Sequence, residues 1–105
     1  MRMTVQEKIT AIESAIRKSH PDIFYHLLED LGDMKYRYWD YMTTEPIDCD
    51  TELKRLNSAN YELCTALLTM LLREDHFCNG MFEERCEAGQ VEQILKQMIA
   101  SLNNA

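Results

Sequence analysis

The sequence has little proline, with two residues among 105, no CxxC pair of cysteines, and no apolar run close to the length of a membrane span. Scarce proline together with a 46% apolar fraction excludes a disordered chain, which has too little apolar surface to offset chain entropy. A helix needs about 20 apolar residues to span a bilayer, so no membrane partner is expected. Thiolate zinc sites usually carry cysteines about two to four residues apart, so no metal and no cofactor is predicted.

Basic residues are also scarce, with 11 against 18 acidic ones, which gives a formal net charge of −7. That charge repels phosphate backbones, so direct nucleic-acid binding is not expected. Acidity keeps a small domain in solution, but it would also suit docking on a basic protein or mimicry of a nucleic acid. A chain of this length forms one domain, which we expect to cover residues 1–105.

The N-terminal stretch lacks the continuous apolar segment of a signal peptide, because Gln6, Glu7 and Lys8 interrupt it. We therefore expect a cytoplasmic protein, in which thiols stay reduced. The four cysteines are then expected to be free and to behave mainly as small hydrophobic side chains: Cys49, Cys64, Cys78 and Cys86.

The first half of the chain predicts two helices. Thr4 and Glu7 have the spacing of a capping box, and the apolar stripe that follows consists of Val5, Ile9, Ile12 and Ile16. Ser19 is the expected N-cap of the second helix. Gly32 is a candidate helix end, but the apolar period continues to Tyr41. We therefore predict that the helix resumes or bends across the glycine, with a short extended segment as the alternative.

The second half predicts a loop over residues 43–50, where Pro46 breaks any helix, and then a long helix over residues 51–73. Beyond Leu63, apolar residues cover nearly every side of that helix, a pattern typical of the buried centre of a domain. Turns at Asn79-Gly80 and at Gly89 flank a short helix, and a last amphipathic helix follows. The sequence thus predicts an all-α bundle of four or five helices around a buried central helix.

The tract from residue 73 to 89 combines reactive side chains with glycine, and we predict a functional turn there. Its candidate residues are Arg73, His76, Cys78, Gly80 and Cys86. The Cys78 thiolate, activated by His76, would be a nucleophile. Together with Cys86 and Cys64, these two residues would be candidate zinc ligands. The structural alternative is that Phe77 and Cys78 turn inward, while Arg73 caps the helix or pairs with a carboxylate of the last two helices.

An aromatic tract precedes the loop, and we predict a partner-binding surface there formed by Tyr36, Trp39 and Arg37. Tyrosine, tryptophan and arginine dominate the energetics of protein interfaces. On a helix, Tyr38 and Tyr41 would face the core while Tyr36 and Trp39 would not.

Several of these residues resemble the pattern of an uncharacterised prokaryotic family, a domain of unknown function. The pattern has a T-x-x-x-R step, an F-C-x-G element, a glycine and an I-L pair. They are present here as Thr69 and Arg73, Phe77-Cys78-Asn79-Gly80, Gly89 and Ile94-Leu95, within residues 60–99. The family prefers arginine at position 76 and an acidic residue at position 79, which weakens any shared charge-based site. The resemblance implies a fold and a bacterial or phage origin, but no reaction.

These observations predict a non-enzymatic protein-interaction module. We expect it to self-associate as a homodimer through the aromatic tract and the turn. One alternative is a small Cys/His-dependent or metal-dependent enzyme at residues 76–89. The other is an acidic mimic that inhibits a nucleic-acid-binding protein.

Overall fold

The computed structural model describes residues 3–104, and within them it contains six α-helices, two 3₁₀ helices and no strand. The predicted all-α class is therefore confirmed, whereas the predicted count of four or five helices is too low. The elements are α1 (Val5–Ala15), α2 (Pro21–Leu31), η1 (Tyr38–Tyr41), α3 (Cys49–Leu53), η2 (Leu56–Ser58), α4 (Tyr61–Phe77), α5 (Met81–Glu87) and α6 (Gln90–Asn103). No helix of this part of the chain combines the length and the apolar character needed to cross a membrane.

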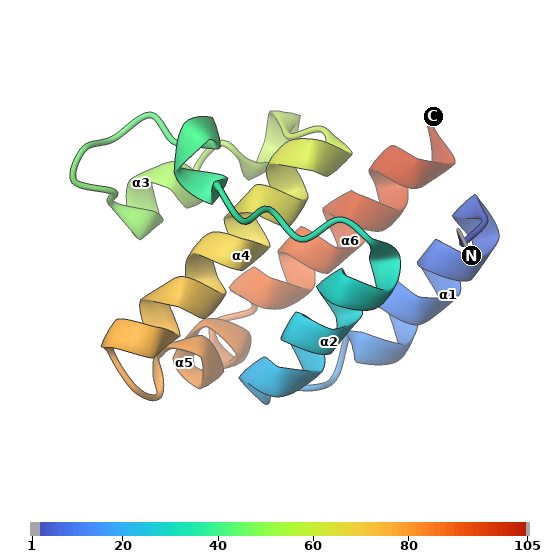
Figure 1. Ribbon diagram of the computed structural model, residues 1–105, viewed down its shortest axis with the longest axis horizontal. Helices are drawn as coiled ribbons and strands as arrows, with labels where there is room; N and C mark the ends of the chain where they lie inside the picture. Colours follow the sequence, from blue (N-terminus) through green and yellow to red (C-terminus); the bar gives the residue numbers. More distant parts are fainter. Residues whose placement is uncertain (1–2, 105) are drawn as a thin grey trace.

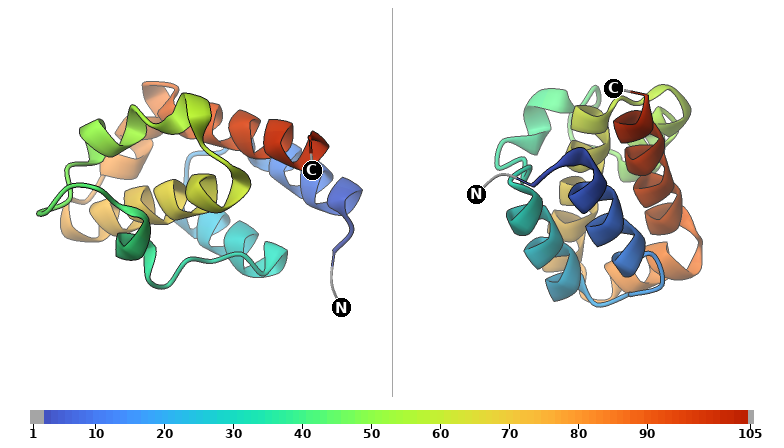
Figure 2. Two further views of the ribbon diagram at one scale, coloured as in Figure 1. Left: turned by 90° about the horizontal axis from the view of Figure 1, so that it is seen from above. Right: turned by 90° about the vertical axis from the view of Figure 1, so that its right-hand side faces the viewer.

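The four longest helices form a closed ring in which α1 contacts α2, α2 contacts α4, α4 contacts α6, and α6 contacts α1 (Figure 1). The shorter α3 and η1 pack on α4, and α5 fills the space between the ends of α4 and α6 (Figure 2). The largest side chains without solvent contact lie inside this ring and include Phe24, Leu28, Leu67, Leu71, Phe82, Ile94 and Met98. Burial of this apolar surface is the main source of stability.

Helix α1 begins as predicted. The Thr4 hydroxyl accepts a hydrogen bond from the Glu7 amide at 3.1 Å, and the Glu7 carboxylate accepts one from the Thr4 amide at 2.9 Å. Helix α2 is capped one residue later than predicted, by His20 in place of Ser19, since the His20 ring nitrogen accepts from the Asp22 amide at 3.1 Å.

The predicted continuation of this helix across Gly32 is wrong. Gly32 has a φ of 73°, the left-handed conformation that ends a helix, and residues 33–37 run without helix to η1. The Asp33 carboxylate, just past the glycine, accepts hydrogen bonds from Lys8 at 2.9 Å and from the Tyr61 hydroxyl at 2.6 Å. These contacts with α1 and α4 direct the chain away from the axis of α2.

The predicted central helix over residues 51–73 is in fact three elements: α3, η2 and α4. The Asn60 side chain accepts from the Leu63 amide at 2.8 Å and so starts α4. Gln97 of α6 donates to the Ala59 carbonyl at 2.9 Å, which holds the interruption in place. The burial predicted for this region is confirmed, because every residue from position 64 to position 72 of α4 is buried.

The turns predicted on both sides of α5 are confirmed. Gly80 has a φ of 92° before the helix, and Gly89 has a φ of 82° after it. A side chain at either position would be strained, because L-residues rarely adopt this conformation. The first turn is also held by Asp75, whose carboxylate accepts from the amides of Gly80 at 3.1 Å and Phe82 at 3.0 Å.

Candidate functional site

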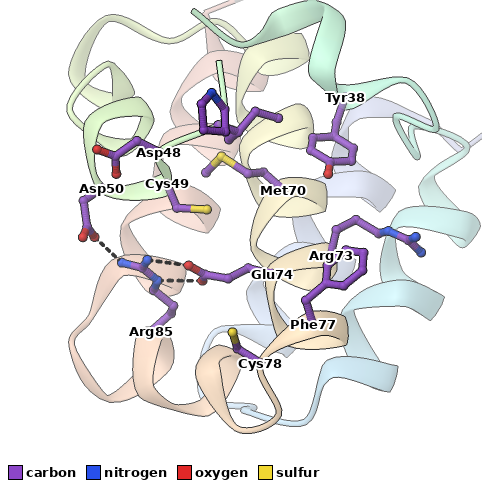
Figure 3. A pocket seen from close by; sticks show the side chains of 12 residues that line it. Tyr38, Asp48, Cys49, Asp50, Met70, Arg73, Glu74, Phe77, Cys78 and Arg85 are labelled. Atoms are coloured by element: carbon purple, nitrogen blue, oxygen red, sulfur yellow. Dashed lines mark hydrogen bonds and ion pairs between the residues drawn. The ribbon is translucent and has the colours of Figure 1, made fainter. Parts of the chain in front are cut away.

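A cleft of about 500 Å³ lies between the C-terminal half of α4 and the segment of residues 46–50 that leads into α3 (Figure 3). Its apolar lining consists of Tyr38, Pro46, Ile47, Met70 and Phe77. Its polar lining consists of Asp48, Cys49, Asp50, Arg73, Glu74, Cys78 and Arg85. This cleft brings together parts of the chain that are far apart in the sequence, from η1 to α5.

One end of the cleft is lined by Arg85, a buried residue with 8% of its surface exposed. The guanidinium donates to Glu74 at 3.0 and 2.8 Å, to Asp50 at 2.6 Å and to Gln90 at 3.0 Å. The hydrogen bonds that Arg85 donates to Glu74 outweigh burial and raise the pKa of Arg85, while the bond that Arg85 donates to Asp50 lowers the pKa of Asp50. Arg85, Glu74 and Asp50 are joined in one network, in which a single cation faces two carboxylates, so this end of the cleft keeps a net charge of −1.

Glu52 is a buried carboxylate that holds the loop leading into the cleft wall of residues 46–50. It accepts from the amides of Thr43 at 3.0 Å and Thr44 at 2.8 Å, from both threonine hydroxyls, and from Arg55 at 2.9 Å. Burial alone would raise the pKa of Glu52, but the hydrogen bonds from Thr44, Thr43 and Arg55 outweigh it and lower that pKa to about 2. The ionised carboxylate thus ties residues 43–44 to α3.

Three of the four thiols have environments that suppress the thiolate form. Burial and the Glu74 carboxylate raise the pKa of Cys49 to about 12, and burial raises that of Cys64 to about 12. Burial, with Glu83 and Glu87 nearby, raises the pKa of Cys86 to about 11. Cys78 is exposed and lines the cleft.

The residues of the predicted functional turn are divided between different surfaces. Arg73 and Cys78 line the cleft, whereas His76 and Gly80 line a separate recess, and Cys86 packs half-buried against the core. Within residues 3–104, no hydrogen bond joins His76 to Cys78, and no three His, Cys, Asp or Glu side chains are placed to hold a metal ion.

Two structural expectations for this turn are wrong. Phe77 does not turn inward, since 77% of its surface is exposed, and Cys78 is exposed as well. Among the described residues Arg73 neither donates to a helix carbonyl nor pairs with a carboxylate, and its side chain is exposed. The physical reason is that α4 continues to residue 77, which places Arg73 and Phe77 one turn apart on its outer face.

The predicted aromatic surface is exposed, although it is not built on an α-helix. Tyr36 is 78% exposed and Trp39 is 52% exposed, while Arg37 pairs with Asp40 at 3.2 Å. The Trp39 ring meets the Tyr38 ring edge-on at 5.5 Å, and Tyr38 packs against the core.

The hollow beside Trp39 and the cleft beside Phe77 share a wall. Trp39 lines a second hollow of about 450 Å³, and this hollow shares Pro46 and Ile47 with the cleft. Trp39 and Phe77 therefore border two adjoining depressions. Tyr36 and Arg37 line neither of the two.

Sequence reasoning missed the ion-paired groups of the cleft, which are Arg85, Glu74 and Asp50, and it missed the buried Glu52 beside the cleft. One signal was available for Arg85, because it follows Phe82 by three residues and so lies on the buried face of α5. A cation on such a face needs a carboxylate partner, and the sequence does not show which of its 18 acidic residues supplies it.

The fold and the cleft define an all-helical domain with a partly apolar surface depression lined at one end by paired charges. A family model described as a family of unknown function (DUF6508) matches residues 3–104, and the chain belongs to this family. The match confirms the predicted membership of an uncharacterised family and extends well beyond residues 60–99. No curated protein and no solved structure matches the chain.

Proposed function

We propose that this chain is a non-enzymatic protein-interaction module, and that the cleft beside Phe77 receives an apolar side chain of a partner polypeptide. The observation that carries the proposal is the exposure of Phe77, 77%, at the mouth of a cleft whose walls include Tyr38, Ile47 and Met70. A single exposed apolar residue needs no explanation, but an exposed aromatic next to an apolar depression is typical of an interface.

The surroundings of the cleft support the same role. Trp39, half exposed, borders the adjoining hollow, so two large aromatic rings are available on one stretch of surface. Aromatic side chains provide large contact area at low entropic cost. The Arg85 and Glu52 networks hold the walls of the cleft, which reduces the entropic cost of binding.

The charges at the mouth of the cleft would then determine specificity. Arg73 and Asp48 line it from opposite sides, and neither forms an ion pair within the described part of the chain (Figure 3). Free charges at the rim of an interface select the partner and its orientation more than they add affinity.

The enzyme alternative has less physical support. A nucleophilic cysteine needs a depressed pKa or a base within hydrogen-bond reach. The pKa values of Cys49, Cys64 and Cys86 are all raised, and His76 lies in a different recess from Cys78. The mimic alternative needs a row of free acids, whereas two of the three acids that line the cleft, Asp50 and Glu74, are held in internal pairs.

Selection of peptides from a displayed random library against the purified protein tests the proposal. We expect enriched peptides to share an apolar anchor, and we expect Phe77→Ser to weaken their binding at least about tenfold, as for an interface hot spot. Val5→Ser is the matched control, since Val5 is 50% exposed on α1 and lines a separate recess. Trp39, the one tryptophan of the chain, reports binding through its fluorescence.

No enrichment of any peptide by a chain that is also monomeric would contradict the proposal. Enriched peptides that bind Phe77→Ser as tightly as the wild type would also contradict it, because the contact would then lie elsewhere.

A further inference from the structure

The exposed groups of the cleft face are complementary to one another. Phe77 is a projecting aromatic ring, and the cleft beside it is a depression with apolar walls. Arg73 lies with Phe77 on one side of the cleft, and Asp48 lies on the other side (Figure 3). Neither Arg73 nor Asp48 has an ionic partner within residues 3–104.

We propose that the occupant of the cleft is a second copy of this chain, related to the first by a two-fold axis. Phe77 of each copy enters the cleft of the other copy, and Arg73 of each copy pairs with Asp48 of the other. This inference rests on the proposed function, and it specifies the partner of the same cleft.

Under two-fold symmetry, the placement of these residues leads to the Arg73–Asp48 pairs between the two copies. In an isologous interface, residue i of one copy meets residue j of the other, and residue j of the first meets residue i of the second. A cation and an anion on opposite sides of one patch are therefore brought together twice. The same relation pairs each projecting Phe77 with a cleft.

The charge of the cleft lining is close to balanced, with two cations and three carboxylates, so the net charge of the chain does not by itself exclude a second copy there. Although the chain carries a net charge of −7, the carboxylates of Asp50 and Glu74 that line the cleft are both paired with Arg85. Within the described residues, the lining charges without an ionic partner are Arg73 and Asp48. A basic segment that approaches Asp48 would also meet Arg73.

Sedimentation equilibrium of the full chain from micromolar to submillimolar concentration tests the inference. We expect the wild type to be a dimer, and we expect Arg73→Glu or Asp48→Arg alone to raise the dimer Kd at least about tenfold, because each puts like charges together at two places. The double variant Arg73→Glu with Asp48→Arg restores opposite charges, so its Kd should return to within about threefold of the wild-type value.

The controls change the net charge by the same amounts away from the cleft. Lys18→Glu matches Arg73→Glu, and Glu13→Arg matches Asp48→Arg, since both residues are exposed and line a different recess. Circular dichroism of every variant checks that the fold is kept. Both controls should dimerise like the wild type.

A wild-type chain that stays monomeric over the whole concentration range would overturn the inference. So would a double variant that dimerises no better than the single ones. If selected peptides bind the wild type through Phe77 while the chain remains monomeric, only the second copy is wrong. If no peptide binds and no dimer forms, the interaction function itself is wrong.

Discussion

The guanidinium of Arg85 lies edge to edge with the carboxylate of Glu74, with Nε 3.0 Å from Oε1 and Nη2 2.8 Å from Oε2. This fork-shaped pair joins α5 to α4, and the bond from Arg85 to Asp50 at 2.6 Å adds α3. One buried side chain therefore connects the three helices that surround this end of the cleft. Bidentate pairs of this kind are among the strongest hydrogen-bonded contacts in proteins.

Replacement of Arg85 by lysine should lower the free energy of unfolding by about 2 kcal/mol, because lysine keeps the charge but cannot form the planar fork. Urea unfolding followed by circular dichroism measures the change. Arg37→Lys is the control, since Arg37 is an exposed residue with a single ion pair to Asp40, and it should cost less than about 0.5 kcal/mol. Equal stability of the Arg85 variant and the wild type would mean that the network contributes little.

Glu52 should make the stability of the chain depend on acidity. Its pKa is lowered to about 2 in the folded protein, against an unfolded value of about 4.3. The stabilisation is therefore fully present above the unfolded pKa and is lost as the pH falls from there toward the folded pKa.

The variant Glu52→Gln isolates this contribution. At neutral pH it should unfold with a free energy about 2 kcal/mol lower than the wild type, because hydrogen bonds from Thr43, Thr44 and Arg55 are weakened or lost. In urea titrations the difference should shrink as the pH is lowered from about 5 to about 3. Glu84→Gln, at an exposed position of α5, should show no such convergence. A constant difference at all pH values would contradict the assignment.

The four thiols should react at very different rates. Cys78 is exposed, whereas Cys64 is buried and the half-buried Cys49 and Cys86 have raised pKa values of about 12 and about 11. Because the thiolate is the reactive form, a disulfide reagent at about pH 8 should modify one thiol quickly and the others far more slowly. Cys78→Ser should remove the fast phase. A fast phase of two equivalents would show that a second thiol is accessible.

The salt dependence of self-association tests whether the net charge of the two copies or the Arg73–Asp48 pairs dominate the electrostatics of the dimer. Two copies with a charge of −7 each and centres about 25 Å apart repel by about 8 kcal/mol in water without salt. The Debye length falls from about 30 Å at 0.01 M salt to about 8 Å at 0.15 M, so most of this repulsion is screened at the higher concentration. The Arg73–Asp48 pairs weaken by less, since exposed pairs contribute only about 0–1 kcal/mol each.

We therefore expect the dimer Kd to fall at least about tenfold when sodium chloride is raised from about 0.01 to about 0.15 M. Sedimentation equilibrium at the two salt concentrations measures the change, with circular dichroism as the check that the fold is the same. A dimer that weakens over this range would indicate that contacts between opposite charges dominate the interface.

Local features of the fold were predictable because the interacting groups are close in the sequence. The Thr4–Glu7 capping box and the turn at Gly80 involve neighbours within one or two turns of the chain. The prediction at Gly32 was wrong because the apolar period continued past it, and the groups that redirect the chain, Lys8 and Tyr61, are 25 and 28 residues from Asp33.

The sequence by itself determined that the chain is helical and which stretch of α4 is buried, since the spacing of apolar residues follows the period of the helix itself. Only the tertiary structure decided which acid pairs with Arg85 and where the cleft lies. Arg85 meets Asp50 across 35 residues, and the cleft walls come from η1, α3, α4 and α5. Side-chain periodicity is a property of one segment. Charge pairing and concave surfaces depend on how several segments are placed relative to one another, and the periodicity of a single segment does not determine that placement.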